Sequence, residues 1–402
     1  MSCVSILFAH LYNAFSILLP SGFDTGSDLI NSLDFLGYNA SKEVGEAGCA
    51  LLNRSFPIQW GCDAIDNASS KEHTLWGIVG ISLMVLPGII GVQIKIWPYI
   101  SEGKYRKALL LSLVALAYPV NLILMAFASI FIGGIRVFGG NDELMKWTIR
   151  LVAAEAFFES FPQMILQGYT ILYGYEVTTV QIFSICASFG LLAKTCIEID
   201  LFMLDTENPM INDPFKSMIH TIKSLPTHGV TIIFRVLSFS LTIAFLRVWS
   251  VIPIAVLYFG LVIITYKRYR HVDDKWIFLA AMWCVPLSNL SALNVYNIAD
   301  QRIFIADRPS RDRIFSFIRA SSIWSFVLHA IVLIFIMVLA KFSPEYLNQR
   351  RVNGRMSLQD LLLKPKPYDV YFHVIFVGTI ALGLVSVILV LRKIKRLAIH
   401  TD

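Results

Sequence analysis

Long runs of apolar residues dominate this sequence. A helix needs about 20 residues to cross a bilayer, and eight runs are long enough: residues 4–36, 75–97, 107–133, 178–204, 227–247, 249–267, 318–341 and 370–391. Hydrophobic residues make up 56% of the 402 and charged residues only 15%, against about 25% charged in soluble domains. The sequence therefore predicts an all-α polytopic membrane protein, folded as one integral membrane domain over residues 1–402.

Two further apolar segments carry a proline near their middle. They run from residue 147 to 173, with Pro162, and from residue 276 to 299, with Pro286. Proline removes a helix hydrogen bond and clashes with the preceding turn. We therefore expect broken or re-entrant segments at these two places.

The spans divide the chain into two halves, residues 1–204 and 205–391, followed by a short basic tail over 392–402. Each half holds several spans and one broken segment, which is the pattern of pseudo-repeats in transporters, although the halves share no direct sequence identity. The tail begins with the basic run Arg392–Arg396, for which anionic lipid headgroups are the natural partner. The rest of the net charge of +6 is spread over short loops, so no nucleic-acid partner is expected.

Basic residues favour the cytoplasmic side of a membrane protein. Most of them lie in the connections 95–107, 205–226, 267–275 and 300–317, which we predict to be inside together with both termini. The connection 342–369 is also basic but falls outside in this topology, so its side is left open.

The first loop, residues 37–73, is polar and predicted to be extracellular. Acceptor sequons for N-glycosylation lie in it at Asn39, Asn53 and Asn67. It also holds Cys49 and Cys62, which would form a loop-closing disulfide in an oxidising compartment.

A polar stripe runs through the first proline-broken segment. Glu155, Glu159, Gln163 and Gln167 follow one another at intervals of four residues. A four-residue step turns a helix by about 400°, so the four side chains lie on one face. Because a charge at the bilayer centre costs roughly 2.5 to 3.5 kcal/mol, this face must meet something polar.

Other charged residues lie within predicted spans. Asp24 and Asp28 share one face of the first span, and Arg235 lies in the span 227–247. The span 178–204 carries Lys194, Glu198 and Asp200. Two interpretations stay open: buried ion pairs that fix helix packing, such as Lys194 with Glu198, or a hydrophilic furrow through the bilayer.

Motifs of catalysis or cofactor binding are not found. The string Asp24-Thr25-Gly26 matches the aspartic protease signature, but no second copy exists. The chain has no phosphate-binding loop, nucleophile elbow, paired Cys-x-x-Cys or calcium loop. We expect neither an enzyme nor a bound cofactor or metal.

The string Glu159-Ser160-Phe161-Pro162-Gln163-Met164-Ile165-Leu166-Gln167 resembles the Glu-Ser-x-Pro-Gln-x-x-Leu-Gln core of the XK-related membrane proteins. The acidic first span, the Leu86-Pro87 step and the run Phe234–Ser238 resemble further parts of that family in the same order. This resemblance implies eight spanning helices with two re-entrant segments in the plasma membrane. Several members are phospholipid scramblases that expose phosphatidylserine in apoptosis after caspase cleavage.

The resemblance makes a phospholipid scramblase that needs no ATP the leading hypothesis. Headgroups would slide along the intramembrane polar residues named above, from Asp24 to Arg235, while acyl tails stay in lipid. One alternative is a scaffold that docks a lipid-transfer protein or a single-span chaperone subunit, and another is a solute transporter or channel. Two features depart from the family: the long first loop, and a tail with little room for a caspase site beyond its final Asp402.

Overall fold

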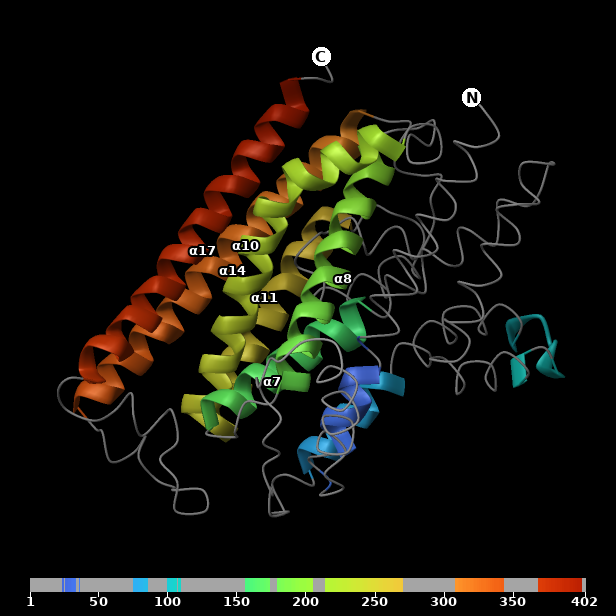
Figure 1. The fold of residues 1–402 in the computed structure, drawn as a ribbon. Coiled ribbons are helices and arrows are strands. Elements are labelled where there is room, and N and C mark those ends of the chain that lie inside the picture. Colours follow the sequence, from blue (N-terminus) through green and yellow to red (C-terminus); the bar gives the residue numbers. More distant parts are fainter. Residues whose placement is uncertain are drawn as a thin grey trace, which may run out of the picture. The chain divides into compact units, whose positions relative to one another are not determined.

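The computed structural model describes residues 24, 26–33, 36, 75–85, 100–106, 108–109, 156–173, 179–204, 214–269, 308–342 and 368–399. These residues are helical or lie in turns, and none of them forms a strand. The principal elements are η1 (Ala156–Ser160), α7 (Phe161–Tyr173), α8 (Thr179–Leu204), α10 (Pro214–Leu246), η2 (Arg247–Ser250), α11 (Val251–Tyr269), α14 (Arg308–Phe342) and α17 (Tyr368–Ile399) (Figure 1).

Four helices are long and apolar enough to cross a membrane. The candidate spans are Val180–Ile197, Ile222–Leu246, Arg319–Leu339 and His373–Lys395. Two shorter apolar helices, Leu75–Val85 and Val248–Ile264, accompany them. The all-helical membrane class predicted from the sequence is confirmed at this level. The segment 276–299 with Pro286 and the loop 37–73 lie outside the described residues.

The chain divides into two compact units. Unit 1 comprises Met1–Gln167 and Glu176–Thr195, and unit 2 comprises Gly168–Tyr175 and Cys196–Asp402.

The proline in the first broken segment marks a change of helix type. Residues Ala156–Ser160 form a π-helix, and the α-helix that follows starts at Phe161, with Pro162 as its second residue. The π-helix runs directly into α7, so Pro162 follows helical residues, and its ring and missing N–H interrupt regular α-helical hydrogen bonding at this point. A wider π-turn next to it aims the preceding side chains differently from a regular helix, and such turns are frequent at functional sites.

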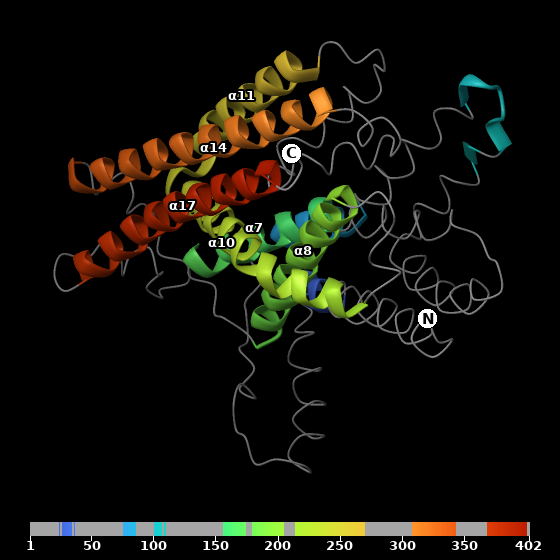
Figure 2. The same cartoon turned by 90° about the horizontal axis from the view of Figure 1, so that it is seen from above.

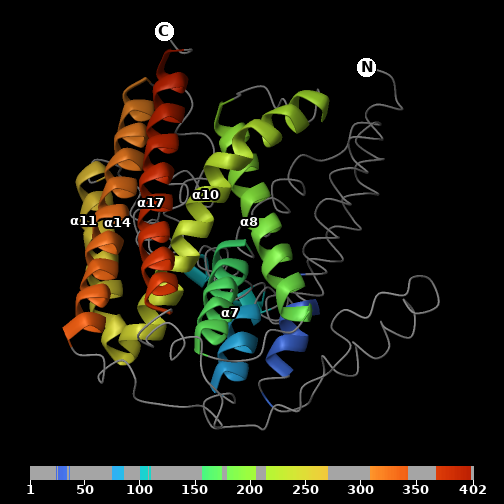
Figure 3. The same ribbon diagram turned by 60° about the vertical axis from the view of Figure 1, so that its left-hand side comes forward.

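Unit 2 contains a bundle of α10, α11, α14 and α17. Figures 2 and 3 show α14 and α17 side by side, with α10 beside α17. Buried side chains of three helices meet in its core, with the rings of Phe245 and Phe376 at 5.4 Å between centroids, next to Leu333 and Ile336. Glycine allows one close approach, because a Cβ at Gly383 would come within 2.5 Å of the Phe234 ring.

The last helix extends further than the sequence pattern indicates. The span 370–391 corresponds to α17, but this helix continues to Ile399. The basic run that starts at Arg392 is therefore helical, and its charges are held on a rigid element.

Candidate functional site

Unit 1 holds a buried cluster of polar side chains, which we call the acidic cluster. Its members are Asp24, Asp28, Ser160, Gln167, Ser184 and Ser188. The two aspartates belong to the helical residues 24 and 26–33, which we call the first segment. Ser160 is the last residue of η1, Gln167 lies within α7, and the other two serines lie on α8. All six are at most 1% exposed.

Asp24 accepts hydrogen bonds from two hydroxyl groups. Ser160 Oγ donates to Asp24 Oδ2 at 2.6 Å. Ser188 Oγ donates to the other carboxylate oxygen, Oδ1. Both oxygens of this buried carboxylate therefore have a neutral donor, which offsets part of the cost of removing it from water.

Asp28 repeats this arrangement one helical turn along. Its Oδ1 accepts a hydrogen bond from Gln167 Nε2 at 2.9 Å and another from Ser184 Oγ. Gln167 Nε2 also donates to the hydroxyl of Ser184. A donor from α7 and a donor from α8 thus converge on one carboxylate oxygen.

Helical spacing explains why two acids can be matched by two serines. Asp24 and Asp28 are four residues apart, and so are Ser184 and Ser188, so each pair projects from one face of its helix. Asp24 takes the later serine and Asp28 the earlier one. The predicted common face of the two aspartates is thereby seen in the contacts they make.

Gln163 binds a different part of unit 1. Its Nε2 donates to the carbonyl oxygen of Gly80 at 2.9 Å. A Cβ at Gly80 would collide with the hydroxyl of Ser32, so a glycine here permits the close approach of the helix Leu75–Val85 to the first segment. We call the string from Glu159 to Gln167 the Pro-Gln core. Its two glutamines therefore contact two different elements.

Glu159 is also completely buried in unit 1, with an exposed fraction of 0%. Together with Asp24 and Asp28 it gives three acidic side chains that solvent does not reach. The acidic cluster is closed in this conformation. A lipid headgroup or water could reach these carboxylates only after the helices move apart.

Other predicted site residues lie elsewhere or outside the described part. Arg235 is buried on α10 in unit 2, at 3% exposure, and Lys194 is half-buried on α8. Glu198 and Asp200 belong to α8, but their side chains lie outside the described residues. The same holds for the whole of Glu155, Asn39, Asn53, Asn67, Cys49 and Cys62.

Three serines of the cluster were missed by the sequence analysis. Ser184 and Ser188 follow Gln181 at helical intervals of three and four residues, and Gln181 Nε2 donates to the Gln167 carbonyl oxygen at 3.5 Å. This periodic polar stripe is the signal that could have identified them. Ser160 follows Glu159 directly and is not part of the series of polar residues spaced four apart, so periodicity alone does not identify it.

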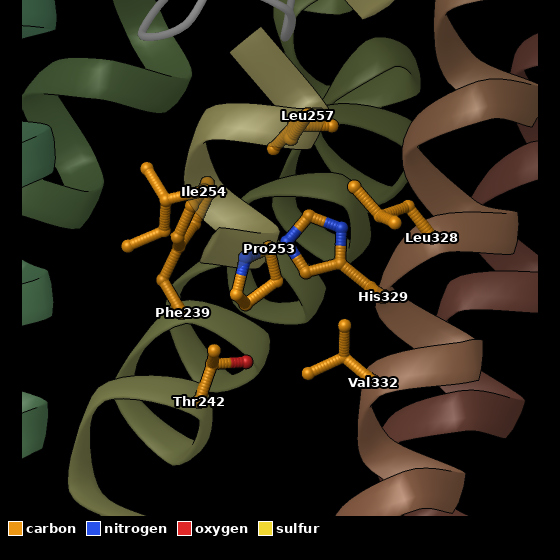
Figure 4. A pocket seen from close by; sticks show the side chains of 8 residues that line it. All are labelled: Phe239, Thr242, Pro253, Ile254, Leu257, Leu328, His329 and Val332. Atoms are coloured by element: carbon orange, nitrogen blue, oxygen red, sulfur yellow. The ribbon is translucent and has the colours of Figure 1, made fainter. Parts of the chain in front are cut away.

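Unit 2 encloses a small cavity beside His329 (Figure 4). Its volume of about 10 Å³ is room for about one water molecule. His329 lies against the rings of Phe234 and Phe239, at 5.6 and 4.9 Å between centroids, and its Nδ1 lies 2.7 Å from the Ser325 carbonyl oxygen. The cavity is too small for a substrate.

A larger apolar groove opens on unit 2 between α11 and α14. Its volume is about 630 Å³. On α14 it is lined by a stripe from Leu328 to Leu339, which covers roughly 16 Å of helix or about half of a 30 Å hydrocarbon core. Trp249 of η2 lies at its edge. These dimensions suit a lipid acyl chain.

No family model, no curated protein and no solved structure matches this chain. The geometry of the site is therefore the basis for a functional proposal.

Proposed function

We propose that the chain is a phospholipid scramblase of the XK-related kind, which lets lipids move between leaflets of the plasma membrane without ATP. The observation that carries this proposal is the acidic cluster, where Asp24 and Asp28 are buried among hydroxyl and amide donors in an apolar, helical chain. Charged groups within membrane segments are costly, and they commonly mark pathways for polar substrates or ions.

Movement of lipid would require the cluster to open. If α8 separates from the first helical segment, Asp24 loses Ser188 and Asp28 loses Ser184 as donors. The amine of a phospholipid headgroup could then replace these hydroxyls, because it is a cation and a hydrogen-bond donor. In this proposal the acyl tails remain in lipid.

A second candidate is favoured by the closure of the cluster. Each hydrogen bond described for Asp24 and Asp28 is made within unit 1, which is also what a purely structural polar core would show. In that case the protein would be a scaffold that docks a lipid-transfer protein or a single-span partner. The acids would then hold helices together and would not contact lipid.

The deciding experiment uses fluorescent phospholipids in liposomes that contain the purified protein. Dithionite quenches only the outer leaflet, so quenching beyond half of the signal reports scrambling. We compare the wild type with Glu155→Gln plus Glu159→Gln, and use Glu102→Gln as a control that removes an exposed acid. A conduit predicts quenching beyond half that falls in the double variant and not in the control.

A plateau at half would be followed by limited proteolysis and by addition of a single-span partner. Persistent absence of scrambling under both conditions would reject the scramblase. Retained partner binding by the double glutamine variant would then favour the scaffold.

A further inference from the structure

Basic side chains gather at one end of the helix bundle in unit 2. We call this group the basic collar. It comprises Lys223 of α10, Lys267 of α11, Arg319 of α14, and Arg392, Lys393 and Lys395 of α17. It is independent of the acidic cluster and of the proposed scramblase activity.

The register of α10 and α17 brings their basic ends together. The two helices run antiparallel, since the Thr231 and Ser386 hydroxyls lie 2.7 Å apart and His228 lies opposite Lys393. Lys223 precedes His228 by little more than one turn and Lys395 follows Lys393 by half a turn, so both point toward the same end.

Basic residues of the other two helices lie at about the same level. Phe234 of α10 packs against Phe326 of α14, and Arg319 lies about two turns, roughly 10 Å, before Phe326. Gly260 of α11 meets Trp324 of α14, and Lys267 lies about two turns beyond Gly260. Because η2 reverses the chain between α10 and α11, α11 runs back toward the end of the bundle at which α10 starts (Figure 3).

Most of the collar charges have no partner among the described residues of unit 2. Five members of the collar are exposed and make no ion pair or hydrogen bond there: Lys223, Lys267, Arg319, Arg392 and Lys395. No acidic side chain is among the described side chains of this unit. Lys393 Nζ lies 3.0 Å from His228 Nε2, which fixes the position of this lysine on α17.

We propose that the basic collar binds the headgroup of a polyanionic phospholipid of the phosphoinositide class. Six cations from four helices at one level of a membrane-spanning bundle match several phosphates better than a single charge. Lys and Arg near a membrane surface each strengthen the interaction with anionic lipid, by about fivefold in affinity per residue. The helical continuation of α17 to Ile399 makes the site rigid, which lowers the entropy lost on binding.

The test uses the full-length chain in neutral detergent micelles. The probe is a fluorescent dioctanoyl phosphatidylinositol bisphosphate, followed by polarisation. Unlabelled dioctanoyl phosphatidylcholine and soluble inositol trisphosphate are the competitors. We expect the phosphoinositide to bind, phosphatidylcholine not to compete, and the affinity to fall as salt is raised. Competition by inositol trisphosphate as strong as by the unlabelled lipid would overturn the assignment to a lipid.

Two matched variants locate the site. Lys223→Gln with Lys395→Gln removes two collar charges and should weaken binding about thirtyfold. Lys104→Gln with Arg106→Gln removes two exposed charges from unit 1, where Lys104 is already paired with Glu102 at 2.7 Å, and should leave binding unchanged. Equal loss in both variants, or no loss in the first, would overturn the proposal. All four side chains are exposed, so neither variant should impair folding.

Discussion

Gln167 donates a hydrogen bond from Nε2 to Asp28 Oδ1 at 2.9 Å, although 139 positions separate the two residues in the chain. This contact gives the second glutamine of the Pro-Gln core a physical role. It joins the helix after Pro162 to the acidic first segment within unit 1. The Pro-Gln core thus contacts the aspartate pair, because Ser160 binds Asp24 and Gln167 binds Asp28.

Breaking this hydrogen bond should destabilise the protein. Gln167→Ala leaves a buried carboxylate with one donor fewer, and we expect a loss of about 2 kcal/mol in the free energy of unfolding. A double-mutant cycle with Asp28→Ala should give a coupling energy of about 1.5 to 3 kcal/mol. Denaturation in detergent, followed by tryptophan fluorescence, measures it. Additive effects of the two substitutions would contradict a direct contact.

The serines of α8 should matter for stability and their exposed neighbour should not. Ser188→Ala removes a hydroxyl donor from buried Asp24 and should cost about 1 to 3 kcal/mol. Cys186→Ala, on the exposed side of the same helix, serves as the control and should change stability by less than about 0.5 kcal/mol. Thermal unfolding midpoints of the two variants make the comparison, and equal midpoints would argue against the acidic cluster as a packing element.

Two glycines of α17 should respond oppositely to alanine. A Cβ at Gly383 would lie 2.5 Å from Phe234 and 2.8 Å from Phe326, so Gly383→Ala should destabilise unit 2 by about 1 to 3 kcal/mol. A Cβ at Gly378 meets nothing within 4 Å, and Gly378→Ala should be neutral or stabilising by up to about 1 kcal/mol because alanine favours helix. Thermal unfolding of both variants checks the difference, and a stable Gly383→Ala protein would show that α10 and α17 can separate slightly without cost.

The sequence marked several polar residues that are buried in the structure, but it did not reveal their hydrogen-bond partners. Periodicity marked Asp24, Asp28, Gln163 and Gln167, because a series of charged or amide side chains on one face is conspicuous in an apolar helix. Their partners are serine hydroxyls, which donate to the aspartates, and the Gly80 carbonyl, which accepts from Gln163. These groups carry no charge and occur commonly in apolar helices. Only tertiary packing, here the meeting of α7 and α8 with the first segment in unit 1, selects which of them are used.

The helix boundaries were likewise predicted only in part. The apolar runs predicted α8 and α11 to within about two residues. The predicted spans begin at residues 227 and 318, whereas α10 starts at Pro214 and α14 at Arg308, so these two helices start 13 and 10 residues earlier. Their first turns are polar or basic, as in Arg308–Arg313, so hydropathy alone could not reveal that the helix continues beyond the apolar core. Pro226 lies within α10 without ending it, which a single-sequence rule does not anticipate.

The basic collar makes a prediction about the side of the membrane that the connection 342–369 occupies. Positive charge favours the cytoplasmic side, so the end of α14 and α17 that carries the collar should be cytoplasmic. The connection joins the opposite ends of these two helices. It should therefore be extracellular, despite its own five basic residues. An Asn-x-Ser acceptor introduced within 342–369 should then be glycosylated in cells. An acceptor added after Asp402 should stay unmodified, and it serves as the matched control. Modification of the C-terminal acceptor without modification of the other would show the opposite orientation of unit 2. The collar would then not face the leaflet that displays phosphoinositides.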